Sequence, residues 1–583
     1  MSKKTKEEKD EQLHKMRHSL AHIMAEAVQS IFPEVKFGIG PVIENGFYYD
    51  FDLPRTLIPE DLPLIEVKMQ EIIKQKNTFE RKEVSKKEAA EFFKKANEPY
   101  KLELIEELND GEITLYKSGQ FVDLCKGPHV DNTSQVGAFK LTHIAGAYWR
   151  GDEKNKMLQR IYGVAFTDKK ELKAYLTMVE EAKKRDHREI GKKLDLFSFH
   201  DEGPGFAFWH NKGNIILQEL YGYMRQQLRD RDYEEIITPP ILNEELWHRS
   251  GHWDKFRENM YFTNIDDRTF AIKPMNCPGG LLIYNNSYHS YKELPIRNAE
   301  FGLVHRHEPS GTLHGLFRVR SFTQDDAHSF CTAEQLQNEI IEMINFVIDV
   351  YSDFGFKDYQ IYIATKPEKY IGEDNVWDMA TSALEESLQK RKLDYELKPG
   401  EGAFYGPKIE FNIKDCLGRN WQLGTIQVDF SMPLRFNAYY IDENGDKKTP
   451  IMLHRAILGS MERFVAILIE HYAGIFPLWL APEQVRVIPV SAEKHLKYAK
   501  SISDELKKYN FRVKLDDSAE SVGKKIRNAD QMKVNYMIVV GDKDIEGQTV
   551  SVRPLRGEDM GAMKLDEFIE LIKKERGGRE IKK

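Results

Sequence analysis

The chain has 583 residues, of which 41% are hydrophobic and 31% charged, and 85 basic against 93 acidic side chains give a net charge of −8. This length predicts three or four domains, and the composition is typical of a soluble globular protein. Four cysteines exclude a disulfide framework and favour a cytoplasmic location, while the acidic balance confines nucleic-acid binding to local basic patches. The charged N-terminus excludes a signal peptide, and no apolar run is long enough for a membrane span.

Residues 1–167 mix short strand-like runs with Gly and Pro turns, which predicts a first α+β domain. The segment HSLAH places two histidines four positions apart on one face of an expected helix, and DLCKGPH adds three more polar side chains. By residue type, four of these five side chains could bind a metal, and the alternative is unrelated surface histidines. The five candidates are His18, His22, Asp123, Cys125 and His129.

Three further blocks follow along the chain. Residues 168–193 are highly charged with a helical pattern, which predicts a helical linker. Residues 194–477 form the largest block, with alternating strands such as NWQLGTIQVDFSM and amphipathic helices. Residues 478–583 alternate strand, helix and strand, which predicts a small α/β domain with a mainly parallel sheet.

Three residues in the largest block suit a zinc ion: Cys277 in KPMNCPGG, His328 in FTQDDAH and His454 in MLHRAILGSMERF. Their separation along the chain makes the signal weak by itself, because buried cysteines and histidines are common. A zinc ion with three protein ligands keeps a fourth position open, as in sites where the metal contacts substrate. The pattern therefore predicts one zinc ion per chain with a role at a substrate site.

Residues 296–328 read as two strands joined by the turn-rich loop PSGTLHG. Arg306 and Glu308 lie two positions apart on the first run, so we expect them on one face, and Arg318 and Phe322 fall on the return run. A guanidinium, a carboxylate and an aromatic ring on one face suit a nucleotide. The alternative is a salt-bridged surface hairpin.

These segments carry a family resemblance. The hairpin sequence FGLVHRHEPSGTLHGLFRVRSFTQDDAH resembles motif 2 of class II aminoacyl-tRNA synthetases, HRAILGSMERF resembles motif 3, and Pro240 lies where the motif 1 proline would. KPMNCPGG, EGAFYGPKIEF and WQLGTIQVDF are similar to the threonyl-tRNA synthetase family, and the matches cover residues 13–560. The resemblance implies an α+β multidomain protein: a seven-stranded-type antiparallel catalytic sheet flanked by helices, an N-terminal α+β editing domain and a C-terminal α/β anticodon-binding domain.

The resemblance also implies the reaction. L-threonine would be activated with ATP and Mg²⁺ to threonyl-adenylate and transferred to tRNA(Thr). Arg306 would hold the α-phosphate and the amino-acid carboxylate, Glu308 would read adenine, and Arg318 would hold the terminal phosphates. Phe322 and Arg463 would enclose the base. Such chemistry requires fixed cations and positioning more than a general base.

In this family the zinc ion would serve to select threonine over valine, because it can bind the substrate hydroxyl. A hydrophobic pocket separates threonine from valine only about a hundredfold, whereas a site that must bind the hydroxyl rejects its absence by about four to five orders of magnitude. The resemblance implies that Asp326 accepts a hydrogen bond from the threonine hydroxyl and that Gln324 and Tyr405 contact the substrate near its amino group. Met275 would shape the pocket.

Serine keeps the hydroxyl and loses one methyl group, a difference of about 1–3 kcal/mol, so we expect a second, hydrolytic site. The N-terminal block resembles the editing domain shared by threonyl and alanyl enzymes. The resemblance implies that the histidines and Cys125 hydrolyse Ser-tRNA(Thr), helped by Asp123 and Lys101, without a metal. A second zinc, as in alanyl-type relatives, stays open.

The C-terminal block resembles the anticodon-binding domain of threonyl, prolyl, glycyl and histidyl enzymes, in which Arg527, Asp544 and Arg553 would read bases. Class II relatives suggest a homodimer. Bacterial members usually carry a small ubiquitin-like domain before the editing domain, and because this chain starts about fifteen residues before HSLAH, we expect that domain to be absent. The competing hypotheses are an RNA-binding regulator without catalysis and a seryl or prolyl enzyme.

Overall fold

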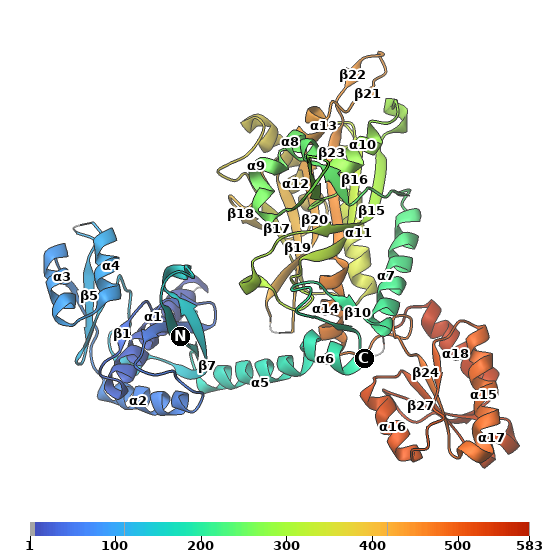
Figure 1. Ribbon diagram of the computed structural model, residues 1–583, viewed down its shortest axis with the longest axis horizontal. Coiled ribbons are helices and arrows are strands. Elements are labelled where there is room, and N and C mark those ends of the chain that lie inside the picture. The colour runs from blue at the N-terminus through green and yellow to red at the C-terminus, as the bar shows by residue number, and fades with distance from the viewer. Residues whose placement is uncertain (1–5, 110, 417, 582–583) are drawn as a thin grey trace. The chain divides into compact units, whose positions relative to one another are not determined.

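The computed structural model describes residues 6–109, 111–416 and 418–581 (Figure 1). The chain divides into two compact units, one ending at Glu180 and the other beginning at Glu181. Across the described residues, no helix is both long enough and apolar enough to cross a bilayer.

The first unit packs a five-stranded antiparallel sheet against two helices, α1 (Lys6–Ile31) and α2 (Asp61–Gln75). The strand order is β1-β3-β8-β7, with β2 also paired to β3. The five strands are β1 (Lys36–Phe37), β2 (Val42–Ile43), β3 (Gly46–Asp52), β7 (Ala138–Tyr148) and β8 (Met157–Phe166). One face of α1 is apolar, and its residues are fully buried against β3, which explains why this long and highly charged helix is held in place.

A second, three-stranded sheet in the same unit has the order β4-β5-β6. It carries two short helices that pack on one another and form a separate small core. The elements are β4 (Glu80–Glu83), α3 (Lys86–Lys95), α4 (Pro99–Glu107), β5 (Thr114–Ser118) and β6 (Phe121–Leu124), followed by the 3₁₀ turns η1 (Thr133–Gln135) and η2 (Trp149–Gly151). The capping box between Ser85 and Glu88 fixes the start of α3.

The predicted helical linker consists of two helices, α5 (Lys169–Arg185) and α6 (His187–Leu194). The break falls at Asp186, whose backbone leaves the helical region and whose side chain accepts a hydrogen bond from the Arg188 amide at 2.8 Å. Asp186 is therefore an N-cap that starts α6 as a new helix.

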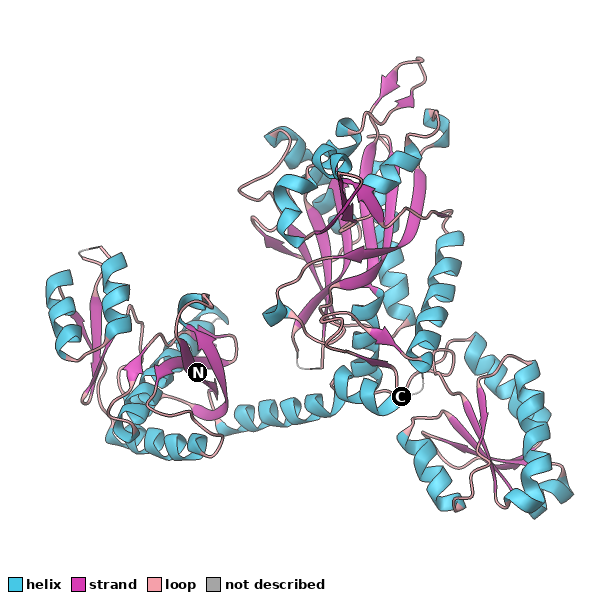
Figure 2. Cartoon of the chain, in the orientation of Figure 1, coloured by secondary structure: helices cyan, strands magenta, loops and turns pink. Residues whose placement is uncertain are grey.

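The second unit is built on an eight-stranded sheet with the order β11-β15-β16-β23-β20-β19-β17-β18. Figure 2 shows its long strands in magenta with helices packed around them. All neighbours are antiparallel except the two edge pairs, β11–β15 and β17–β18. The strands are β11 (Glu234–Glu235), β15 (Ile296–His305), β16 (Ser321–Cys331), β17 (Tyr359–Ala364), β18 (Glu396–Lys398), β19 (Lys408–Lys414), β20 (Asn420–Asp429) and β23 (Ile451–Ser460). The expected antiparallel sheet is confirmed for its six central strands, and it has eight strands, not seven, because β11 and β18 add short parallel edges.

Helices cover this sheet and smaller elements surround it. The main helices are α7 (Asn211–Arg229), α11 (Leu336–Asp353), α12 (Asp374–Lys390) and α14 (Met461–Tyr472). Shorter helices are α8 (Glu244–Ser250), α9 (His252–Phe256), α10 (Cys277–Tyr284) and α13 (Ser431–Arg435), with 3₁₀ turns η3 (Arg257–Asn259), η4 (Tyr291–Glu293) and η5 (Ser310–Thr312). Small sheets pair β9 (Phe197–Ser198) with β10 (Phe208–Trp209), β12 (Ile241–Asn243) and β13 (Tyr261–Ile265) with β14 (Arg268–Ile272), and β21 (Tyr440–Ile441) with β22 (Lys447–Lys448).

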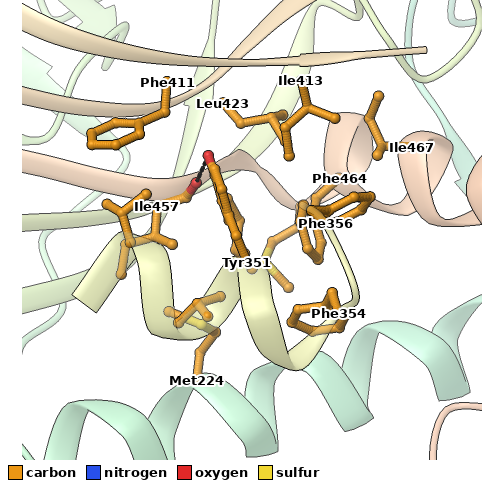
Figure 3. Close-up of a cluster of buried hydrophobic side chains, with 14 of the residues drawn as sticks. Met224, Tyr351, Phe354, Phe356, Phe411, Ile413, Leu423, Ile457, Phe464 and Ile467 are labelled. Atoms are coloured by element: carbon orange, nitrogen blue, oxygen red, sulfur yellow. Dashed lines mark hydrogen bonds between the residues drawn. The ribbon is translucent and has the colours of Figure 1, made fainter. Parts of the chain in front are cut away.

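Tyr351 on α11 lies at the centre of the main core, surrounded by apolar side chains from the helices and the sheet (Figure 3). Its hydroxyl donates to the Ile457 carbonyl at 3.1 Å and accepts from the Gly424 amide at 2.8 Å. A buried polar group requires such partners, and here they connect α11 to two neighbouring strands, β23 and β20.

Strand β23 contains a bulge next to this tyrosine. Gln324 pairs with Ser460 and Asp326 pairs with Ala456, so the strands shift register between these two pairs. The Asp325 carboxylate accepts hydrogen bonds from the amides of Ile457 (2.8 Å) and Leu458 (3.0 Å). The bulge therefore has its backbone donors satisfied inside the core.

The C-terminal part of the second unit is the expected α/β domain. Its sheet has the order β25-β24-β26-β27-β28, parallel across the first three strands and antiparallel beyond. The elements are β24 (Val485–Pro489), α15 (Ala492–Lys508), β25 (Val513–Leu515), α16 (Val522–Gln531), β26 (Tyr536–Val540), α17 (Asp542–Gly547), β27 (Val550–Pro554), β28 (Gly561–Met563) and α18 (Leu565–Gly577).

Candidate active sites

The three proposed zinc ligands meet on one face of the central sheet. Their ligand atoms lie within 4.8 Å of one another, and Cys277, His328 and His454 are all buried. His328 on β16 pairs directly with His454 on β23, and Cys277 begins α10. Residues 126 positions apart in sequence are thus adjacent because two neighbouring strands place them on the same face.

The donor set suits a metal. Within the part of the chain that the structure describes, the buried Nε2 atom of His328 has no hydrogen-bond partner, although buried polar atoms normally have one. Burial lowers the pKa of His328, which keeps the imidazole neutral, and burial raises the pKa of the Cys277 thiol. A thiolate at Cys277 thus requires a nearby cation, and the three donors are those that zinc prefers.

A cavity of about 490 Å³ extends from this trio across the sheet face. It is lined by every residue proposed from sequence for threonine and ATP: Met275, Arg306, Glu308, Arg318, Phe322, Gln324, Asp326, Tyr405 and Arg463. Asp326 accepts a hydrogen bond from the Asn276 amide group at 3.0 Å, and burial raises the pKa of Asp326. The sequence-derived set is therefore brought together in one hollow.

The hairpin differs in detail from the expected one. Strand β15 ends at His305 and β16 begins at Ser321, so Arg306, Glu308 and Arg318 lie in the connecting loop and only Phe322 lies on a strand. Beyond the Arg306 amide, which still donates to the Arg320 carbonyl at 2.9 Å, the Glu308 amide turns back to the Arg306 carbonyl at 2.8 Å, and Pro309 with the turn at η5 keeps the segment out of the ladder. The Arg306 guanidinium still lies over the Phe322 ring at 5.1 Å and donates to the Pro274 carbonyl at 3.2 Å.

Arg463 is held before any ligand binds. Its Nε donates to the Phe317 carbonyl at 3.0 Å and its Nη1 to the Gln422 carbonyl at 2.8 Å, while its guanidinium lies 5.5 Å from the Trp421 ring. Desolvation, with repulsion from two neighbouring arginines, lowers the pKa of Arg463 to about 10, so it stays a cation at neutral pH. Four arginines line this cavity, Arg306, Arg318, Arg455 and Arg463, and such a concentration of positive charge suits a polyanion.

The N-terminal candidates form a second cluster. The Sγ atom of Cys125 lies 3.2 Å from His18 Nε2 and 3.3 Å from His129 Nε2, and the ligand atoms of all four metal-type residues lie within 4.8 Å of one another. Both helical histidines lie on α1, as the HSLAH spacing predicts. Burial lowers the pKa of His18, His22 and His129 and raises that of Cys125 to about 12.

A buried ion pair supports that cluster. Lys101 Nζ lies 2.5 Å from Asp123 Oδ1, and the Tyr49 hydroxyl donates to Asp123 Oδ2 at 2.5 Å. His22 Nε2 lies 3.7 Å from the same carboxylate, and both charged side chains are at most 4% exposed. The site thus combines three neutral imidazoles, a thiol and a fixed lysine–aspartate pair. Tyr49 was not identified from sequence, and its alternation with the buried Phe47 and Phe51 on β3 is the only signal for it.

The three C-terminal candidates lie in the α/β domain at different depths. Arg527 on α16 and Arg553 on β27 are exposed. Asp544 is 7% exposed, and its carboxylate accepts hydrogen bonds from the Ser551 hydroxyl at 2.8 Å and the Gly541 amide at 3.0 Å. Its hydrogen bonds fix the segment between β26 and β27.

Several cavity residues were not identified from sequence. Trp421, Thr425 and Gln427 on β20 face the cavity, and the alternation of NWQLGTIQVDF could have placed the last two on one face. His252 lies beside the trio, with its Nε2 3.0 Å from Met275 Sδ, and burial lowers its pKa to about 3. No motif in the sequence analysis includes it.

Comparison with known proteins defines the class first. Residues 261–472 match the tRNA synthetase class II core domain (G, H, P, S and T), residues 484–575 match the anticodon binding domain, and residues 113–162 match the threonyl and alanyl tRNA synthetase second additional domain. The eight-stranded sheet with its arginine-lined hollow is thus a class II aminoacyl-tRNA synthetase core.

Full-length relatives define the family. The chain is 56% identical to the threonine–tRNA ligase of Caldanaerobacter subterraneus subsp. tengcongensis over 96% of its own length and 86% of that protein. It is 54% identical to the threonine–tRNA ligase of Acetivibrio thermocellus over 95% of the chain and 87% of that protein. The chain belongs to the threonine–tRNA ligase family.

Solved structures agree with this assignment. The structure described as the RNA binding domain of threonyl-tRNA synthetase from Cryptosporidium parvum Iowa II aligns with a TM-score of 0.64 and 40% identity, covering 67% of this chain and 98% of that one. A putative threonyl-tRNA synthetase from Aeropyrum pernix aligns with a TM-score of 0.59 and 28% identity, covering 68% and 96%. The hypothesis of a seryl or prolyl enzyme is therefore wrong.

Proposed function

We propose that this chain activates L-threonine with ATP and Mg²⁺, transfers it to tRNA(Thr), and hydrolyses Ser-tRNA(Thr) at its N-terminal cluster. The observation that carries the proposal is the cavity that joins the Cys277–His328–His454 trio to Arg306, Arg318 and Arg463. Amino-acid recognition and ATP binding then share one hollow, as carboxylate attack on an α-phosphate requires.

In this cavity the cations act on the reacting groups. Arg306 bridges the threonine carboxylate and the α-phosphate, and its positive charge offsets the repulsion between these two negative groups as they approach. Glu308 accepts from the adenine amino group, and Phe322 with Arg463 encloses the ring. Arg318 holds the terminal phosphates, whose charge Mg²⁺ also neutralises. These groups position and stabilise, and no side chain has to remove a proton from the carboxylate.

Threonine selection is assigned to the trio and its neighbours. Cys277, His328 and His454 would hold one zinc ion per chain, which supplies a Lewis acid for the substrate amino and hydroxyl groups. Asp326, fixed by Asn276, accepts from the threonine hydroxyl. Gln324 and Tyr405 contact the substrate near its amino group, and valine leaves the hydroxyl acceptor unpaired.

Editing is assigned to the four metal-type residues of the N-terminal cluster with Lys101 and Asp123. The buried lysine–aspartate pair fixes His22, and the neutral imidazoles can orient water and the ester. The proposal is metal-free hydrolysis, because the Cys125 thiol already lies within hydrogen-bond range of His18 and His129. A second zinc ion per chain is the alternative.

The remaining assignments concern tRNA and assembly. Arg527, Asp544 and Arg553 contact anticodon bases, and Asp544 also holds the segment between β26 and β27. We propose domains at residues 1–167, 168–193, 194–477 and 478–583, a cytoplasmic location and a homodimer. The dimer is supported by exposed apolar side chains near the β11 edge of the sheet: Ile237, just after β11, is 84% exposed, and Leu303 on the neighbouring strand β15 is 45% exposed.

The test is ATP–pyrophosphate exchange with an amino-acid panel. Wild type should exchange only with threonine and, more weakly, serine, and Arg463→Ala should abolish exchange without loss of helical content. Arg576→Ala is a matched control, because Arg576 also donates to two backbone carbonyls and stacks on an aromatic ring, but outside the cavity. Exchange by Arg463→Ala near the wild-type rate at saturating ATP would show that the ATP site is misassigned.

A further inference from the structure

His187, at the start of the linker helix α6, is a buried histidine outside the proposed cavity. It is 0% exposed, and its Nδ1 lies 2.8 Å from Glu470 Oε1 on α14. Its other nitrogen, Nε2, lies 3.1 Å from the Leu316 amide nitrogen in the loop between β15 and β16. One imidazole therefore joins three elements that are far apart in the sequence.

The hydrogen-bond roles follow from chemistry. A backbone amide can only donate, so Nε2 of His187 is the acceptor and Nδ1 carries the hydrogen, which it donates to the Glu470 carboxylate. The second carboxylate oxygen of Glu470 accepts from the Cys416 thiol at 2.8 Å. This arrangement fixes both the tautomer and the ring orientation of His187.

The loop is shaped to receive this ring. Gly315 has a φ of +49°, and a Cβ built on it would lie 2.2 Å from His187 Nε2. Any side chain at position 315 would thus displace the imidazole from the loop. The Phe317 ring also contacts His187, with ring centroids 4.6 Å apart.

The next residues along the loop lead directly to the cavity. The Phe317 carbonyl accepts from Arg463, and its ring stacks on Trp421 at 4.4 Å with an interplanar angle of 6°. Arg318 follows immediately and lines the cavity. The position of the Leu316 amide thus determines where Phe317 and Arg318 lie.

We propose that His187 is a positioning residue for ATP. Its Nε2 anchors Leu316 in the loop between β15 and β16, which carries Arg318, and this makes helix α6 part of the ATP site. This inference rests on the proposed function, in which Arg318 and Arg463 bind ATP. Threonine binds at the other end of the cavity, near Cys277, so loss of the anchor should weaken ATP binding selectively.

Two isosteric substitutions separate positioning from packing. In His187→Gln the side-chain oxygen can reach the Nε2 position and accept from Leu316, whereas in His187→Asn the amide nitrogen replaces Nδ1 and donates only to Glu470. We expect His187→Asn and His187→Ala to raise the KM for ATP about tenfold in pyrophosphate exchange, because a buried amide loses its acceptor. The KM for threonine should change less than twofold, and His187→Gln should restore the KM for ATP.

His210→Ala is the matched control. His210 also pairs with a carboxylate, Asp195 at 2.6 Å, but it does not contact the loop, so both KM values should match wild type. A wild-type KM for ATP in His187→Asn, or equal values for the Asn and Gln variants, would overturn the inference. If instead Arg463→Ala retains exchange in the same assay, the proposed ATP site itself fails. If His187→Ala does not fold, the comparison of the KM for ATP between His187→Asn and His187→Gln still tests the inference.

Discussion

The buried ion pair between Glu300 and Lys273, which lies four positions before Cys277 in the sequence, gives a stability prediction. Lys273 Nζ lies 2.8 Å from Glu300 Oε1, and both side chains are 3% exposed. The lysine also donates to the Thr238 hydroxyl at 2.8 Å, and the Thr238 amide donates to Glu300 at 2.9 Å. Glu300→Gln keeps an oxygen for Thr238 but leaves the lysine charge buried and unpaired.

The magnitude follows from that geometry. Breaking a fully buried pair costs about 3–5 kcal/mol because one charge remains without a partner. Removing both charges, in Lys273→Met with Glu300→Gln, should recover most of this loss, since no uncompensated charge is left in the core. The double variant is therefore expected to be more stable than the single variant, although it carries one more substitution.

Unfolding in urea, monitored by circular dichroism, measures the effect. The urea concentration at the midpoint of unfolding of the second unit is compared among the wild type, the single variant and the double variant. The slope should stay constant while the midpoint moves, because the surface exposed on unfolding is unchanged. A loss below about 1 kcal/mol for Glu300→Gln would refute the reasoning, since that is the range of an exposed pair. So would a double variant less stable than the single one.

Three further predictions concern the zinc ligand Cys277, the N-terminal histidines and the pH dependence of stability. Cys277→Ser should lose its zinc, measured as metal per chain, together with threonine activation; full metal content and activity would remove the metal assignment. His18→Ala with His22→Ala should leave pyrophosphate exchange unchanged and abolish deacylation of preformed Ser-tRNA(Thr), and deacylation at the wild-type rate would exclude editing at that cluster. Burial raises the pKa of Glu462 to about 7, so the folded state holds its proton longer than the unfolded chain, and stability falls as pH rises from about 4.5 to 7. Glu462→Gln should therefore gain stability relative to wild type at pH 8 compared with pH 5, and an equal difference at both pH values would contradict this.

Much of the site could be predicted from sequence because its chemistry lies in short segments. Cys277, His328 and His454 each lie within a distinctive run, and alternation along the strands brings the two histidines to one face. The helical spacing of His18 and His22 likewise predicted their common face on α1. Local rules of period and residue type were sufficient for these positions.

Other features depend on contacts that local rules do not describe. The loop position of Arg306 follows from where the strand ladder ends, which a two-residue spacing does not reveal. His187 lies in a charged run that reads as a solvated linker, yet it is fully buried because Gly315 and Glu470, distant in sequence, enclose it. Tertiary packing thus overrode the charge pattern at that position.

The bulge in β23 has a further consequence for the geometry of catalysis. The two steps along β16 from Gln324 to Asp326 are matched by four steps along β23 from Ser460 to Ala456, so the bulge inserts two residues. An insertion of two preserves the parity of side-chain alternation, whereas an insertion of one would invert every side chain beyond it. Ser460 therefore keeps the same face as His454, and the start of α14 lies about 7 Å, two strand repeats, nearer to His454 than a continuous ladder would place it. Deleting one bulge residue would turn Ser460 to the opposite face of the sheet, whereas deleting both inserted residues would keep its facing and leave it opposite Gln324, so the distance between the amino-acid and nucleotide ends of the cavity would stay the same.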